Sequence, residues 1–156
     1  MMGRVLAALL GSVFVLSAVQ AQAAPDPRGF WLIENERSII ELYDCDSGLC
    51  GRIAWIIEGG MEYDTANPDE SLRDRPLCGL DILWGFQRDS RDETTWRDGE
   101  IYKADDGDIY SARLRMIGER ELDVRGFVGI ALFGSSQSWT RVSADDFERC
   151  TPPDGA

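Results

Sequence analysis

The sequence contains no histidine. Histidine is the most common general base and a frequent zinc ligand, so its absence excludes Ser-His-Asp and Cys-His systems and the usual catalytic zinc sites. Two carboxylates could still hydrolyse glycosides, but among 28 acidic residues no pair stands out. We therefore expect a protein that is not an enzyme and that binds no cofactor.

Positive charge is also scarce, with 16 Lys and Arg residues against 28 Asp and Glu residues and a net charge of −12. Arg4 is the only charged residue among the first 23, so a chain that starts at Ala24 carries 15 − 28 = −13. A strongly acidic protein is repelled by nucleic acid and by anionic membrane surfaces. Nucleic acid is therefore excluded as a partner.

The chain has one long apolar run, over residues 5–19, and it lies at the N-terminus. Arg4 precedes the run and Ala21-Gln22-Ala23 follows it, the pattern of a secretory signal peptide with its cleavage site. We expect residues 1–23 to be removed and the protein to be periplasmic or secreted. The run is short for a membrane span and nothing similar follows it, so the mature chain should have none. Residues 24–156 should form a single domain with a loose tail after about residue 150.

The four cysteines contain no C-x-x-C pair, which argues against a four-thiolate metal site and a thioredoxin-like redox pair. An even number of cysteines in an exported chain favours disulfides. Three pairings are open. Cys45 and Cys50 flank a short predicted hairpin loop, so we favour a Cys45–Cys50 bridge together with a Cys78–Cys150 bridge.

The sequence also lacks a convincing long helical pattern, and it shows instead the two-residue alternation of half-buried strands. In segment 121–128, for example, Leu122, Val124 and Val128 share one face. Asp98-Gly99 and Asp106-Gly107 are hairpin turn signals. The expected strands are 29–33, 38–44, 49–57, 80–87, 100–103, 108–117, 121–128 and 138–142.

Eight or nine short strands in an open flat sheet would leave unpaired edges and a bare face. Closure into an antiparallel barrel removes both problems, so we predict an all-β, antiparallel closed barrel, with a β-sandwich as the alternative. At about eight strands the interior is just wide enough for side chains or for one small ligand.

The long connection 58–76 has turn signals and room for one helical turn near 71–75. A loop of this length in a compact domain is usually a lid or a functional loop, so we expect it at the mouth of the barrel. Its oxygen-bearing side chains could bind Ca²⁺, but their spacing is not that of an EF-hand, and Asx turns explain them more simply. No metal site is expected. The side chains concerned are Asp64, Asn67, Asp69 and Glu70.

Several short motifs follow one another in the order found in a known bacterial family. The chain resembles the secreted family catalogued as domain of unknown function 2147, over nearly all of the mature chain. The resemblance implies a lipocalin-like barrel and no assigned activity. Its main motifs are Gly29-Phe30-Trp31, Arg73-Asp74-Arg75-Pro76-Leu77, Gly99-Glu100-Ile101-Tyr102, Val124-Arg125-Gly126-Phe127 and Trp139-Thr140-Arg141-Val142.

Gly29-x-Trp31 also resembles the G-x-W opening of lipocalins, in which the Trp closes one end of the barrel and a late Arg stacks on it. The matching residues here are Gly29, Trp31 and Arg141. A guanidinium stacked on an indole is a favourable cation–π contact.

Two function classes remain open. One is a binder of a small apolar or amphipathic ligand in a hollow barrel, and the other is an envelope protein–protein interaction module with a solid barrel. A cavity of a few hundred Å³ would favour the first. The aromatic residues expected near such a cavity are Trp31, Trp55, Trp84, Phe86, Tyr110 and Trp139.

Overall fold

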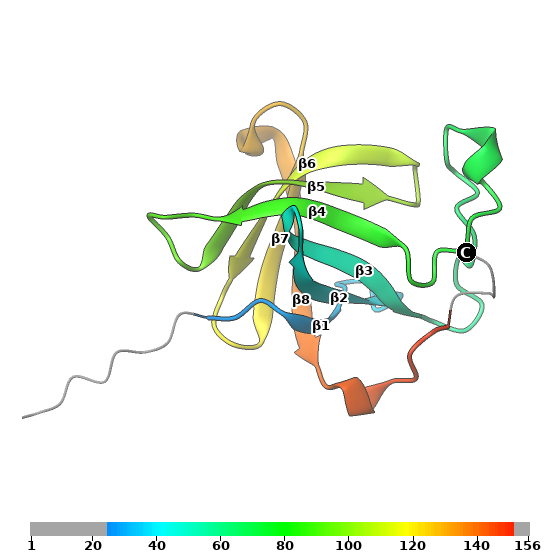
Figure 1. Ribbon diagram of the computed structural model, residues 1–156, viewed down its shortest axis with the longest axis horizontal. Coiled ribbons are helices and arrows are strands. Elements are labelled where there is room, and N and C mark those ends of the chain that lie inside the picture. Colours follow the sequence, from blue (N-terminus) through cyan, green and yellow to red (C-terminus); the bar gives the residue numbers. More distant parts are fainter. Residues whose placement is uncertain (1–24, 152–156) are drawn as a thin grey trace, which may run out of the picture.

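A computed structural model describes residues 25–151. The predicted signal peptide, residues 1–23, and the last five residues of the predicted loose tail lie outside the described residues. Within the described part, eight antiparallel strands pair in sequence order and close into a barrel (Figure 1). The predicted fold class is confirmed, and the sandwich alternative is not.

Each strand pairs with the strands before and after it, and β1 pairs with β8 to close the barrel. Three short 3₁₀ helices, η1 to η3, interrupt the connections. The strands are β1 (Gly29–Leu32), β2 (Ser38–Cys45), β3 (Gly48–Ile56), β4 (Asp81–Arg88), β5 (Thr95–Lys103), β6 (Asp108–Met116), β7 (Glu121–Phe127) and β8 (Gly134–Val142), and the 3₁₀ helices are η1 (Glu70–Leu72), η2 (Ala131–Phe133) and η3 (Ala144–Asp146).

Because successive strands run in opposite directions, their connections alternate between the two ends of the barrel. We call the end that carries the connections after β1, β3, β5 and β7 the open end. The end that carries the lead-in to β1 and the connections after β2, β4 and β6 is the closed end. The open-end connections are residues 33–37, 57–80, 104–107 and 128–133.

The strand β5 is longer than predicted, because Asp98-Gly99 is a bulge within it and not a turn. The register with β6 shifts between Trp96 and Gly99, and Asp98 has the left-handed φ of 63°. A Cβ on Gly99 would collide with the ring of Phe86. An Asp-Gly pair therefore serves here to bring two strands close together, whereas Asp106-Gly107 lies in the predicted turn between β5 and β6.

The last two strands also differ from the prediction. β7 ends at Phe127 and β8 begins at Gly134, so the connection between them is shorter than expected. Val128, which was predicted to share the buried face of Leu122 and Val124, is 72% exposed because it lies beyond the end of β7.

Two disulfides join Cys45 to Cys50 and Cys78 to Cys150, the pairing that the sequence favours. The first bridges the β2–β3 hairpin. The second ties the chain after η3 to the end of the long β3–β4 connection. The Cys150 amide also donates to the carbonyl of Ala54 on β3, at 2.9 Å. No helix within residues 25–151 combines the length and the apolar character that a membrane crossing requires.

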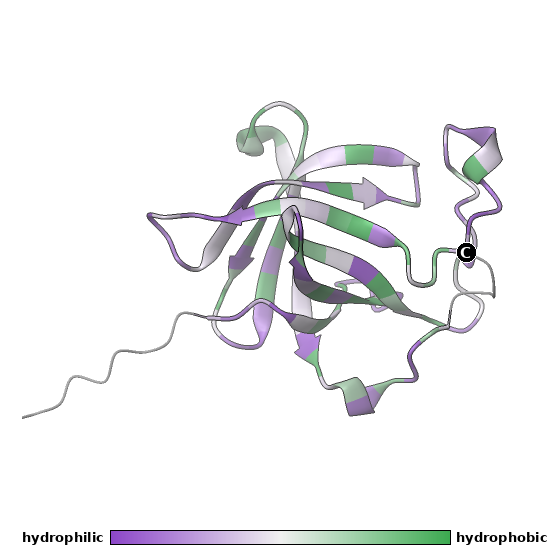
Figure 2. Ribbon diagram, in the orientation of Figure 1, coloured by the Kyte–Doolittle hydropathy of each residue, from purple (hydrophilic) through white to green (hydrophobic). Residues whose placement is uncertain are grey.

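The buried side chains inside the barrel form one hydrophobic cluster, and hydrophobic and hydrophilic positions alternate along several strands (Figure 2). Part of this cluster is tightly filled by large side chains that are at most 5% exposed. These are Trp31, Leu42, Leu49, Phe86, Trp96, Leu114 and Leu122.

Candidate functional site

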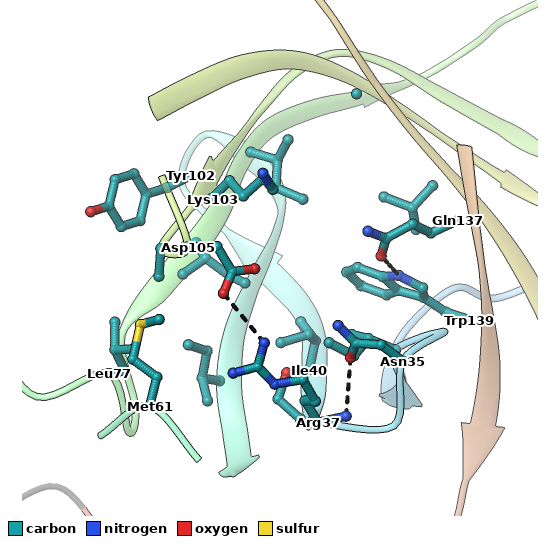
Figure 3. Close-up of a pocket in the computed structure, with 18 of the residues that line it drawn as sticks. Asn35, Arg37, Ile40, Met61, Leu77, Tyr102, Lys103, Asp105, Gln137 and Trp139 are labelled. Carbon is teal, nitrogen blue, oxygen red and sulfur yellow. Dashed lines mark hydrogen bonds and ion pairs between the residues drawn. The ribbon is translucent and has the colours of Figure 1, made fainter. Parts of the chain in front are cut away.

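A cavity of about 430 Å³ occupies the open half of the barrel (Figure 3). It is bordered by residues from the strands and from the connections after β1, β3 and β5. The barrel is therefore hollow toward one end and filled toward the other.

The wall of this cavity is mainly aliphatic. Every isoleucine or leucine in it comes from a strand or from the start or end of an open-end connection, so the barrel itself shapes the space. The apolar lining includes Ile33, Ile40, Ile53, Ile56, Met61, Leu77, Ile82, Ile101, Val124 and Trp139.

Polar side chains gather around the mouth. Arg37 and Asp105 form an ion pair of 3.6 Å, and both side chains are about half exposed. Gln137 accepts a hydrogen bond of 3.0 Å from the indole Nε1 of Trp139, which fixes that ring in the wall (Figure 3). Lys103 also lines the mouth and is paired with Asp106 on the β5–β6 turn. An occupant would therefore meet an apolar interior and a polar rim.

At the closed end, the guanidinium of Arg141 lies over the indole of Trp31, with 4.2 Å between Cζ and the ring centroid. The two residues are direct partners across the β1–β8 ladder. Gly29 has a φ of +115°, and a Cβ there would lie 3.0 Å from Arg141 Nη1. The G-x-W pattern thus leaves room for the stacked arginine.

The guanidinium of Arg141 also binds three backbone carbonyls. Its Nε donates to Glu119 at 2.7 Å, its Nη1 to Arg28 at 2.7 Å and its Nη2 to Asp26 at 2.5 Å. Burial lowers the pKa of Arg141 from its usual value, and an arginine remains charged despite such a shift. This single side chain therefore ties the lead-in, the β6–β7 turn and the indole of Trp31 together.

Of the six aromatic residues expected near a cavity, Tyr110 and Trp139 line it. Trp31 and Phe86 are buried in the filled part of the barrel instead.

Trp55 and Trp84 also lie outside the lining, because bulges break the alternation on which their prediction depends. In β3, Trp55 pairs with Ile39 and Ile53 with Ile40, which leaves one extra residue between them. Ile56 then lines the cavity in place of Trp55.

In β4, Gly85 has a φ of +80° and the register with β3 shifts beside Ile82. Leu83 and Phe86 are consequently buried, while the indole of Trp84 donates a 2.8 Å hydrogen bond to the exposed Glu100.

Sequence reasoning missed the aliphatic lining residues. It selected large aromatic side chains, whereas the cavity exists where the chain supplies isoleucine and methionine. The available signal was weak: Leu77 and Ile101 lie within the motifs of the family resemblance, but nothing in a single sequence separates a lining isoleucine from a core one.

The long β3–β4 connection is fastened at the mouth by a buried carboxylate. Asp64 is fully buried and accepts hydrogen bonds from Asn67 at 2.8 Å, from Arg75 at 2.5 Å and from the hydroxyl of Tyr102 on β5. Burial opposes ionisation of Asp64, but these three donors outweigh it, and the pKa of this carboxyl lies below its ordinary value.

Backbone hydrogen bonds complete this fastening. The amide of Asp64 donates to Arg75, and the amide of Leu77 donates to Glu62. The connection is therefore a clamp on the β5 side of the mouth. Asp64 and Asn67 are engaged in holding it, and no cluster of three or more potential metal-ligating residues occurs among residues 25–151.

The family comparison identifies the class of protein. The family described as "Uncharacterized protein conserved in bacteria (DUF2147)" matches residues 29–141, and the chain belongs to this family. The matched segment begins at the glycine of G-x-W and ends at the arginine that stacks on the tryptophan. The suspected resemblance is confirmed.

The fold is similar to that of a solved structure, protein HP1028 from Helicobacter pylori, which is described as belonging to the lipocalin family. The TM-score is 0.69 at 18% sequence identity, and the match covers 78% of this chain and 86% of the other. This likeness shows a lipocalin-like fold. A comparison with curated proteins found no match.

Proposed function

We propose that this protein is an exported, non-catalytic binding protein that holds one small apolar or amphipathic molecule in the open half of its barrel. The observation that carries the proposal is the cavity of about 430 Å³ with aliphatic walls and a polar mouth. Sites for small molecules typically have about 300–1,000 Å³ and walls of this kind. The lipocalin-like fold is consistent with this use.

Export to the periplasm or beyond is supported by the signal-peptide pattern of the first 23 residues and by the two disulfides. Disulfides persist in oxidising compartments and are rare in the cytosol.

A non-catalytic role is supported by the side chains around the cavity. The sequence has no histidine, and all four cysteines are in disulfides. Among the described residues that line the cavity, Asp105 is the one carboxylate, and it is paired with Arg37. Acid–base hydrolysis by paired carboxylates requires a second one.

The distribution of polarity suggests how a ligand would lie. Its apolar part would contact Ile40, Ile53 and Val124 inside the barrel. Its polar group would remain at the mouth near Arg37, whose half-exposed ion pair with Asp105 contributes little stability and is free to rearrange.

A variant that fills the cavity tests this proposal. Gly126 lines the cavity, and a Cβ there would have only ordinary contacts, at 3.8 Å, with Ile101 and Tyr110. Gly126→Val should therefore fold normally and occupy ligand space. Thr140→Val is the matched control, because Thr140 is exposed and does not line the cavity.

The measurement begins with native mass spectrometry of protein purified from its own compartment, to detect a carried molecule. Fatty acids, quinones and small aromatic compounds are then titrated against the tryptophan emission, for which Trp139 is the reporter in the wall. Wild type and Thr140→Val should bind with a saturable change, and Gly126→Val should bind at least about tenfold more weakly. No carried molecule and no saturable binder would instead favour a protein–protein interaction module.

A further inference from the structure

The connection between β7 and β8, residues 128–133, presents an unusual amount of apolar surface to solvent. We call it the apolar loop. Val128 is 72% exposed, Ile130 58%, Leu132 76% and Phe133 76%. Isolated exposed apolar residues are ordinary, whereas four within six residues form a continuous patch, and such patches mark interaction sites. The sequence carries no charged residue between Arg125 and Arg141.

The apolar loop is held in shape by Arg125 on β7. Its Nε donates to the carbonyl of Ala131 at 2.6 Å, and its Nη2 donates to that of Gly134 at 3.0 Å. The amide of Phe133 donates to Ile130 at 3.1 Å within η2. The carbonyls of Ile130, Ala131 and Gly134 are thus hydrogen-bonded, while the large side chains of the loop remain exposed.

This arrangement suits a lipid surface better than a protein strand. A partner that extends a sheet needs free backbone groups, and Arg125 binds the loop carbonyls of Ala131 and Leu132. Shallow insertion among lipid headgroups needs exposed apolar side chains without charged neighbours, and no residue from Gly126 to Thr140 is charged. The net charge of −12 disfavours anionic headgroups, so the surface that fits is a zwitterionic one.

The apolar loop also lies at the open end of the barrel. It extends beyond β7 and β8 at the top of the view in Figure 1, and it is a hydrophobic segment in Figure 2. The residues Gly126 and Ser135, which flank it, line the cavity. A protein docked through this loop would rest on the membrane with its cavity close to the lipid.

We propose that the apolar loop is a membrane-docking surface through which the protein binds reversibly to a zwitterionic bilayer, with Leu132 and Phe133 inserted at the interface. The insertion is shallow, because the patch is one loop wide and is backed by polar strands. Docking goes beyond the proposed ligand binding and does not depend on it.

The test is flotation of the protein with phosphatidylcholine vesicles. The chain is used from Ala24 onward, which contains the whole described barrel and omits the apolar segment 5–19. The double variant Leu132→Ser with Phe133→Ser removes the two most exposed apolar side chains of the loop. Ile117→Ser is the matched control, because Ile117 is 47% exposed in the β6–β7 turn at the closed end.

Wild type and Ile117→Ser should float with the vesicles. The partition coefficient of the double variant should fall by on the order of a hundredfold, because two large apolar side chains no longer leave water. Replacing part of the phosphatidylcholine by phosphatidylglycerol should weaken binding.

Three results would overturn the proposal. They are equal flotation of the double variant, absence of flotation for wild type, and tighter binding to the anionic vesicles. Analytical ultracentrifugation without lipid provides a further check: wild-type dimers that the double variant does not form would assign the patch to a second copy of the chain. Thermal melts should show that both variants fold, and the cavity titrations, which use no lipid, are unaffected by either outcome.

Discussion

The two ends of the barrel are held together by different interactions. At the closed end, Trp31 lies in a filled hydrophobic core, and Arg141 stacks on it. At the open end, the interior is hollow, and the mouth is held by the polar network around Asp64. The comparison shows how a small barrel can contain a cavity. Dense packing at the closed end compensates for the apolar contacts that are missing around the cavity at the open end.

Trp31→Ala should have the largest effect on stability, because it opens a void in the filled end. Truncation of a buried tryptophan costs about 3–5 kcal/mol. Ile56→Ala, at the wall of the cavity, should cost about 1 kcal/mol or less, because Ile56 is only half buried and already borders empty space. Urea unfolding measures both free energies, and equal losses would show that the two ends do not differ in packing.

Asp64→Asn should destabilise the clamp at the mouth by about 2–3 kcal/mol at neutral pH, because it removes the charge that faces Arg75. Breaking a fully buried ion pair costs about 3–5 kcal/mol. The expected loss is smaller here because the side chain of Arg75 is one-third exposed to solvent.

This contribution should depend on pH in a defined direction. Because the folded-state pKa of Asp64 lies below the ordinary 3.8, the stabilisation is complete above about pH 4 and is lost as the pH falls through the folded pKa. The difference between wild type and Asp64→Asn should therefore shrink in acid. Hydrogen exchange of the Leu77 amide should accelerate there before that of the barrel strands, and a pH-independent difference would contradict this assignment.

Arg141→Ala should cost about 1–3 kcal/mol, through the loss of the stack on Trp31 and of packing. Arg141→Lys should recover part of this loss, since a lysine keeps the charge but cannot bind three carbonyls in one plane. An unchanged urea midpoint for Arg141→Ala would mean that the closed end is held by the core alone.

The fold was predictable because alternation and turn signals are local. The period of two along Glu121–Phe127 and the Asp106-Gly107 turn place strands and hairpins without any knowledge of distant contacts. The stack of Arg141 on Trp31 is in the structure as the resemblance of Gly29-x-Trp31 to the lipocalin opening implied.

The lining of the cavity was not predictable, because it depends on bulges. An extra residue in β3 turns Ile56 toward the cavity in place of Trp55, and the backbone at Gly85 separates the faces of Trp84 and Phe86. A one-residue shift reverses every inward and outward assignment after it. Such shifts are set by the neighbouring strand, as with Gly99 under the ring of Phe86, and a single strand's sequence does not reveal them.

The pairing of Trp31 with Arg141 also bears on how the chain acquires its fold. The strand β1 is synthesised first, and its partner β8 follows about 110 residues later. One edge of β1 therefore stays unpaired until β8 has been synthesised. An unpaired strand edge invites pairing with other chains, and short edges limit that risk. β1 is the shortest strand, with four residues. When β8 arrives, the fit of Arg141 between Trp31 and the carbonyls of the lead-in selects the correct register for closing the ring.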